Sequence, residues 1–245
     1  MNRRELIVGA LSLAPTGARS AAPFFDEQSV TIMGRAHFLS DVVVPSPNGK
    51  HARHEFASSY AAAVLEEVFK SGASIPVKTA SLDRWARVTG PAPWRMPGGR
   101  ETTLQEILLS QGAARVAPQS NDLPFIDRLY RAEDIARENA LGLWTQRVFR
   151  IRDAALGEWS RGFQIYRGVI LAANERNSRI FFNFGADFRT DFTATVSKGA
   201  LRRWRRKIDY AAAAGREVEV RGIVERINGP SIELKHEMQI RLIES

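Results

Sequence analysis

Apolar residues recur every three or four positions through the first half of the chain and alternate with polar residues through much of the rest. The helical spacing predicts three amphipathic helices, over residues 54–70, 102–112 and 124–144. The alternating stretches, rich in β-branched and aromatic residues, predict strands. In the first half these are a hairpin over 29–44 and strands over 75–80 and 85–90, with a loop over 91–100. The chain is therefore predicted to be an α+β protein.

Beyond Trp144 the pattern changes from helices to strands, which places a domain boundary between residues 145 and 160. An Asn-Gly-Pro turn at 228–230 between two alternating segments indicates a hairpin. Several strands with one late helix are typical of a small barrel. The expected strands are 163–175, 179–185, 188–196, 216–234 and 239–244, with a basic helix over 201–215.

The first 22 residues resemble an export signal. Arg3 and Arg4 precede an apolar run over 6–14, and small residues follow it. The run is too short to span a bilayer, and paired arginines before it are typical of twin-arginine export. We therefore expect a signal over 1–22, no transmembrane segment in the mature chain, and a periplasmic or secreted protein. The alternative is a disordered or helical N-terminus of a cytoplasmic protein.

Charge and cysteine content narrow the classes of partner and chemistry. The formal net charge is +8 and the pI is about 10.3, which favours nucleic acid or another polyanion as partner. The chain contains no cysteine, which excludes disulfides, thiolate metal sites and a cysteine nucleophile.

Three short motifs resemble the thermonuclease, or staphylococcal-nuclease-like, family. The segment DRWAR at 83–87 is similar to D-x-Y-G-R, LLSQGAARVAP at 108–118 to L-L-x-x-G-x-A-x-V, and AEDIARENALGLW at 132–144 to a closing helix ending in G-L-W. The resemblance implies a five-stranded OB-type barrel with three helices over 23–148. Residues 149–245 look like a second, smaller OB-like barrel.

In active members of the family the resemblance implies metal-assisted phosphodiester hydrolysis. Carboxylates hold Ca²⁺, a glutamate lies near the attacking water, and two arginines clamp the phosphate, because a guanidinium donates two hydrogen bonds and offsets developing charge. Arg87 matches the second arginine and is the candidate catalytic residue. Trp85 occupies the family's aromatic position, and Ala86 replaces its usual glycine.

The other half of the family's site is missing. Val43 stands at the metal-binding aspartate, Ser46 at the glutamate and Phe38 at or near the first arginine. Valine offers no oxygen to a cation, and a serine hydroxyl is a poor general base. We therefore expect no metal site, with Ca²⁺ involved only if the family mechanism survives.

A substitute site is conceivable on the preceding strand. Arg35, His37 and Asp41 have the same parity, so His37 and Asp41 could join Arg87 around a phosphate. The alternative is that His37 and Asp41 are partly exposed polar residues of a strand.

Basic and aromatic residues suggest two surfaces for nucleic acid. The first is Arg84 with Trp85, and the second is the cluster of Arg202, Arg203, Arg205 and Arg206 around Trp204. The helical spacing of Leu201, Trp204 and Ile208 favours the alternative that Trp204 lies in the core and the arginines form a solvated face.

The aromatic run over 180–192 invites the same question. Ile180, Phe182 and Phe184 share one parity and Phe181 has the other, so most of these side chains are predicted to be barrel core rather than stacking platforms.

The sequence thus predicts an exported thermonuclease-like protein that binds nucleic acid or another polyanion, with hydrolysis disfavoured by the missing metal ligands and base. One alternative is a metal-dependent phosphodiesterase with a rearranged site. Another is a non-catalytic module of the cell envelope that binds a protein partner.

Overall fold

The computed structural model describes residues 29–44, 52–76, 81–187, 189–206 and 209–243. It contains both helices and strands, which confirms the α+β class. The chain divides into two compact units, Met1–Val148 and Phe149–Ser245. The expected signal over 1–22, and Ser46, lie outside the described residues. Within those residues, none of the helices combines the length and apolar character needed to cross a bilayer.

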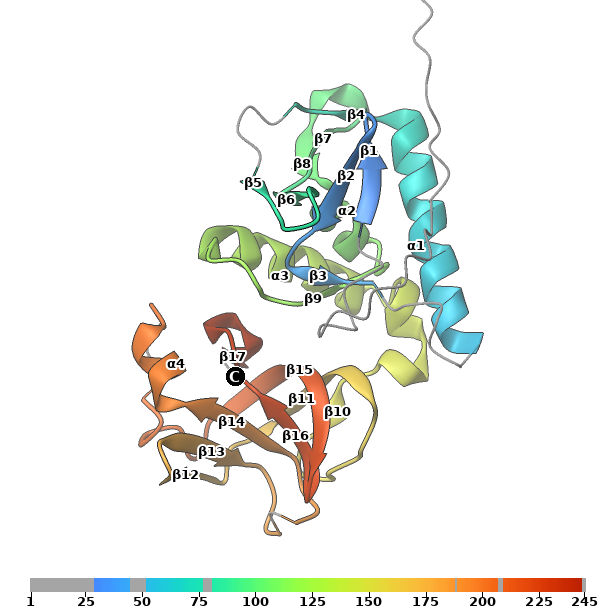
Figure 1. Cartoon of the computed structure of the whole chain (residues 1–245). Coiled ribbons are helices and arrows are strands. Elements are labelled where there is room, and N and C mark those ends of the chain that lie inside the picture. The colour runs from blue at the N-terminus through green and yellow to red at the C-terminus, as the bar shows by residue number, and fades with distance from the viewer. Residues whose placement is uncertain (1–28, 45–51, 77–80, 188, 207–208, 244–245) are drawn as a thin grey trace, which may run out of the picture. The chain divides into compact units, whose positions relative to one another are not determined.

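The described strands of the first unit form three small sheets (Figure 1). The largest has the spatial order β1-β2-β6-β5, with β2 and β6 parallel and the other neighbours antiparallel. Its strands are β1 (Ser29–Ile32), β2 (Arg35–Leu39), β5 (Ser81–Leu82) and β6 (Val88–Gly90). The other sheets are β4 (Ala73–Ser74) with β7 (Pro93–Arg95) and β8 (Glu101–Thr103), and β3 (Val42–Val43) with β9 (Arg115–Val116).

Three strand predictions for this unit are corrected. The strand expected over 85–90 begins only at Val88, because residues 83–87 form a turn. The loop expected over 91–100 contains β7 and a short 3-10 turn, Pro97–Gly99. Ile75 and Pro76 lie outside any strand, and 77–80 is not described.

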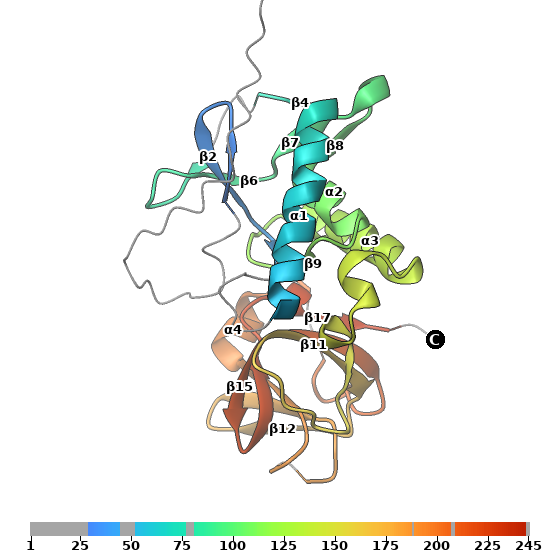
Figure 2. The same ribbon diagram turned by 90° about the vertical axis from the view of Figure 1, so that its right-hand side faces the viewer.

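The three predicted helices are present as α1 (Ala52–Ser71), α2 (Leu104–Ser110) and α3 (Leu123–Glu138), and α2 packs against both others (Figure 2). Thr103 caps α2 by accepting the backbone N–H of Glu106 at 3.2 Å. Helix α3 ends earlier than predicted, since Gly142–Thr145 forms a separate 3-10 turn.

Two glycines bring the ends of these helices together. Gly112 and Gly142 both have positive φ angles, 67° and 52°, and the Leu143 N–H donates to the Gly112 carbonyl at 2.8 Å. A Cβ on Gly142 would lie 2.4 Å from the Gly112 oxygen. Tyr60 of α1 donates its hydroxyl to the Gln111 carbonyl at 2.9 Å, so all three helices meet at this contact.

The second unit is one extensive sheet with the spatial order β10-β11-β15-β16-β14-β13-β12 and β17 beside β15. β14 pairs with β16, and β10 with β11, in parallel, and the other pairs are antiparallel. Only Ile170 and Leu171 separate β11 from β12. The strands are β10 (Arg152–Asp153), β11 (Gly162–Val169), β12 (Ala172–Arg176), β13 (Arg179–Asn183), β14 (Thr193–Ser197), β15 (Glu217–Ile227), β16 (Gly229–Glu233) and β17 (Ile240–Leu242).

The helix predicted over 201–215 is much shorter and starts earlier. It is α4 (Lys198–Arg203), capped by the Ser197 hydroxyl, which accepts the N–H of Ala200 at 3.1 Å. After Trp204 the described backbone turns away from helical geometry.

The core of the second unit follows the predicted parity. Ile180, Phe182 and Phe184 are buried, and Trp204 is only 6% exposed. The Phe192 ring stacks on Tyr166 with centroids 4.1 Å apart. Phe181, with the other parity, is only half-buried.

We expect the two neighbouring phenylalanines of β13 to differ sharply in their contribution to stability. Phe182→Ala should lower the free energy of unfolding by about 3–5 kcal/mol, because it leaves a cavity in the core. Phe181→Ala should cost much less. Denaturant unfolding of both variants measures the difference, and equal losses would contradict the assigned strand parity.

Candidate functional site

Asp83 builds the turn that carries the family-like motif at 83–87. Its Oδ1 accepts the backbone N–H groups of Trp85 at 2.9 Å and Arg87 at 3.0 Å. The Asp83 N–H donates to the Arg87 carbonyl, and the Ala86 N–H to the Asp83 carbonyl, both at 3.0 Å. One side chain therefore fixes the tip of the hairpin between β5 and β6.

The guanidinium of Arg87 is already occupied by side chains of the domain. Its Nε donates to Asp83 Oδ2 at 2.7 Å and its Nη1 to Ser29 Oγ at 3.0 Å. Its central carbon lies 4.7 Å from the ring centroids of both Phe38 and Trp85. Both members of the Asp83–Arg87 ion pair are largely buried, so a phosphate at Arg87 would compete with a partly desolvated carboxylate.

Phe38, at or near the position expected for the family's first arginine, contacts Arg87. Its ring gives the Arg87 guanidinium an aromatic surface through a cation–π contact.

Next to Arg87, the hairpin exposes a flat aromatic surface, which we call the platform. Trp85 is 51% exposed, and the guanidinium carbon of Arg84 lies 3.9 Å from its ring centroid. An exposed indole with a guanidinium on it can stack a nucleic-acid base and attract a phosphate.

His37 lies on the opposite face of the sheet from Arg87. In β2 it is opposite Val30 and Val88, whereas Ser29 and Phe38, which contact Arg87, are paired with each other. Burial, and then the charge of Arg35, lower the pKa of His37, so its imidazole is neutral at pH 7.

Asp41 serves a structural purpose. The strand that was predicted to carry it ends at Leu39, and Asp41 sits fully buried in a turn with φ +65°. Its Oδ1 accepts the N–H groups of Gln119 and Ser120, both at 2.7 Å. The predicted parity with His37 is therefore wrong, and the structure does not assemble a site from His37, Asp41 and Arg87.

The described residues do not fit a Ca²⁺ site of the family type. Val43, at the aspartate position, is a buried residue of β3 that pairs with Arg115. Ca²⁺ takes 6–8 oxygen ligands. No group of three or more histidine or acidic side chains among the described residues is placed to hold a metal ion.

The second predicted basic surface is exposed and surrounds Trp204, whose side chain is buried. Arg202 and Arg203 end α4, and Arg205 and Arg206 follow it, all four exposed. The Glu237 carboxylate accepts the backbone N–H groups of Arg205 at 3.0 Å and Arg206 at 2.5 Å. With Trp204 in the core, this surface has charge without a stacking platform.

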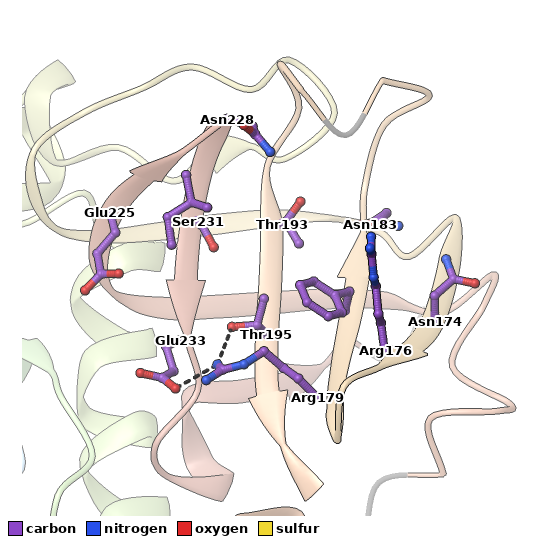
Figure 3. A pocket seen from close by; sticks show the side chains of 12 residues that line it. Asn174, Arg176, Arg179, Asn183, Thr193, Thr195, Glu225, Asn228, Ser231 and Glu233 are labelled. Atoms are coloured by element: carbon purple, nitrogen blue, oxygen red, sulfur yellow. Dashed lines mark hydrogen bonds and ion pairs between the residues drawn. The ribbon is translucent and has the colours of Figure 1, made fainter.

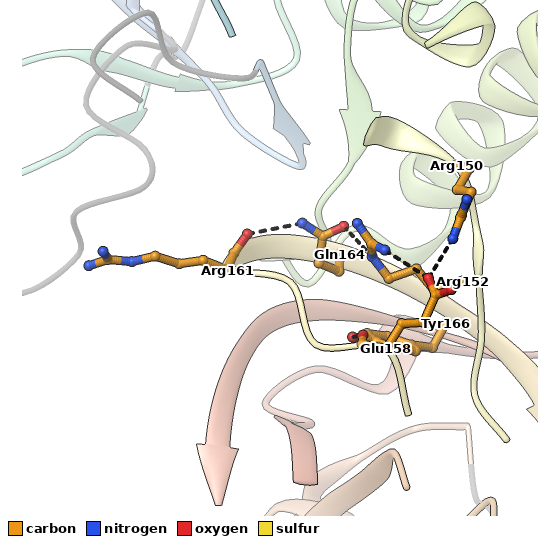
Figure 4. A network of polar contacts seen from close by, with 6 residues as sticks. All are labelled: Arg150, Arg152, Glu158, Arg161, Gln164 and Tyr166. Atoms are coloured by element: carbon orange, nitrogen blue, oxygen red, sulfur yellow. Dashed lines mark hydrogen bonds and ion pairs between the residues drawn. The ribbon is translucent and has the colours of Figure 1, made fainter. Parts of the chain in front are cut away.

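A further arginine network, which the sequence did not indicate, lies at the start of the second unit (Figure 4). Arg150 and Arg152 both donate to Glu158 Oε2, at 2.5 and 3.2 Å, and Arg152 also donates to Gln164 at 3.2 Å. The Tyr166 hydroxyl donates to the Glu158 carbonyl at 2.6 Å, and burial raises the pKa of Tyr166 to about 12. These bonds tie residues 150–158 to β11.

Comparison with known proteins agrees with the motifs. Residues 38–146 match the family described as staphylococcal nuclease homologue. This part of the chain is therefore a thermonuclease-like domain. No curated protein matches the chain.

Ala86 is expected to strain the turn, since its φ is +59° where the family usually has glycine. Ala86→Gly should raise the free energy of unfolding by about 1 kcal/mol. Ala36→Gly, at an exposed position of β2, should lower it by about 0.5–1 kcal/mol. Denaturant unfolding distinguishes them, and a loss of stability in both would contradict strain at Ala86.

Asp83→Asn should weaken the domain in a pH-dependent way. Burial alone would raise the pKa of Asp83, but hydrogen bonds from Arg87 and Trp85 and the charge of Arg87 bring it below its usual value. The carboxylate therefore stabilises the fold above its ordinary pKa of about 3.9, and this contribution is lost as the pH falls through the lower folded value.

At neutral pH we expect the variant to lose about 1–3 kcal/mol of stability. Unfolding measured from neutral to acidic pH should show the difference from wild type shrinking below about pH 4. A constant difference across that range would contradict the ion pair.

Proposed function

We propose that this chain is an exported protein that binds nucleic acid or another polyanion through its thermonuclease-like domain without hydrolysing it. The observation that carries the proposal is the hairpin tip. There, Arg84 and Trp85 form an exposed platform, while Asp83 neutralises the one arginine retained from the family's phosphate clamp. The full chain has a net charge of +8, and about +6 remains without residues 1–22, which adds attraction for polyanions at long range.

The exposed arginines of the second unit extend this proposal. Arg202, Arg203, Arg205 and Arg206 would add phosphate contacts without base stacking, because Trp204 is buried. Such contacts raise affinity and its salt dependence but read no sequence.

The proposed organisation is an export signal over 1–22, a thermonuclease-like OB domain over 23–148 and an OB-like barrel over 149–245. The order of strand pairing supports the OB-like barrel over 149–245. From β11 it runs through β15, β16, β14 and β13 to β12, which directly continues β11, and the helix α4 lies between β14 and β15. For the first barrel the support is the family match. Periplasmic or secreted location rests on the signal-like sequence.

The test uses labelled single-stranded DNA and RNA, with Ca²⁺ and with chelator, and reads retention and cleavage from the same samples. We expect retention that weakens steeply with salt, and no product. Trp85→Ala should cost about 1–3 kcal/mol of binding, as loss of a stacked base does. Arg84→Ala should weaken binding and reduce the salt slope. Arg100→Ala and Trp159→Ala, exposed residues outside the hairpin, are the matched controls.

Two results would contradict the proposal. Ca²⁺-dependent product that disappears in Arg87→Ala would establish a phosphodiesterase with a rearranged site. Absence of retention at low salt would exclude nucleic acid and direct the search to protein partners in the envelope.

A further inference from the structure

The second unit carries an open groove of about 620 Å³ on the outer face of its sheet (Figure 3). This volume falls within the range of about 300–1,000 Å³ typical of small-molecule sites. Strands β12, β13, β14, β15 and β16 contribute its side chains. None of the residues predicted from sequence to bind nucleic acid lines it.

Strand register arranges the groove as two rows across the sheet. In one row, Phe181 lies opposite Asn174 on one side and Thr195 on the other. In the next row, Asn183 lies opposite Thr193. Because the alternate residues Ile180 and Phe182 point into the core, these polar side chains and the Phe181 ring face outward together.

Five uncharged polar side chains of the groove have hydrogen-bonding capacity to spare. None makes a side-chain hydrogen bond to another residue that the structure describes, and Ser231 is itself buried, at 5% exposed. Amides and hydroxyls both donate and accept, so together they can satisfy a ligand rich in hydroxyl groups. They are Asn174, Asn183, Thr193, Asn228 and Ser231.

The charges of the groove cancel, unlike those of the chain as a whole. Arg176 and Arg179 are balanced by Glu225 and Glu233. Arg179 Nη1 donates to Glu233 Oε1 at 2.7 Å and to Thr195 Oγ1 at 3.3 Å, as the dashed lines of Figure 3 show. A nucleic-acid strand would bring a phosphate with each nucleotide toward the Glu225 and Glu233 carboxylates, which disfavours it here.

We propose that this groove binds an uncharged oligosaccharide. The half-buried ring of Phe181 offers an electron-rich face to the C–H face of a sugar ring, and the surrounding amides and hydroxyls bind its hydroxyl groups. The site is independent of the polyanion binding proposed above, since it shares no residue with the hairpin tip or the α4 surface.

The test is calorimetric titration of the full chain with uncharged tetrasaccharides, cellotetraose and the tetramer of N-acetylglucosamine, and with an oligothymidylate of similar length. We expect at least one tetrasaccharide to bind with an affinity that low and high salt leave unchanged. Phe181→Ala and Asn183→Ala should each weaken this binding about tenfold, which corresponds to about 1.4 kcal/mol.

Controls separate loss of the site from loss of the fold. Trp159→Ala removes another exposed aromatic residue of the same unit and should leave saccharide binding unchanged. Thermal unfolding confirms that each variant is folded, and Asn183→Ala keeps the test valid if Phe181→Ala is destabilised. Because the Trp85→Ala variant should bind tetrasaccharide normally, failure of the polyanion proposal and failure of this one are distinguishable.

Three results would overturn the proposal. These are absence of binding by both tetrasaccharides, binding that Phe181→Ala and Asn183→Ala do not weaken, or oligothymidylate binding that these same two substitutions abolish. The last would assign the groove to nucleic acid.

Discussion

The first unit depends on a contact made without side chains. Gly112 and Gly142 bring the ends of α2 and α3 together backbone to backbone, and a methyl group at either position would overlap a carbonyl oxygen. Tyr60 of α1 joins them through Gln111. Two of the three motifs that identify the family contain these glycines. The resemblance to the family therefore rests largely on residues that build the scaffold.

Regular periodicity was sufficient to predict the elements whose residues pack in a regular way. The three helices and the inward parity of Phe182 follow from local sequence. Two of the errors fall where one carboxylate overrides periodicity. Asp83 turns the backbone over 83–87, and Glu237 accepts the N–H groups of Arg205 and Arg206 beyond the point where α4 ends. Such bonds depend on tertiary position or on a single side chain, and neither leaves a periodic signal.

For the candidate sites, the sequence indicated individual residues but not the residues that they contact. It located Arg87, yet the carboxylate that binds it lies four residues earlier in the same motif. It grouped His37 with Asp41 by parity, which fails once a strand ends between them. The groove was overlooked because Asn183 and Thr193 each look like an ordinary solvated strand residue. Only the register between β13 and β14 places Thr193 beside Asn183, on the face that Phe181 shares.

The contact between Phe38 and Arg87 also limits how a phosphate clamp could be engineered into this domain. An arginine introduced at position 38 would remove the aromatic surface under Arg87 and place a like charge beside it. Alone, that substitution would cost stability and gain no metal, because Val43 still lacks an oxygen. Position 38 is therefore tied to the packing of Arg87, so a second arginine and the stability of this hairpin cannot both be obtained by one substitution.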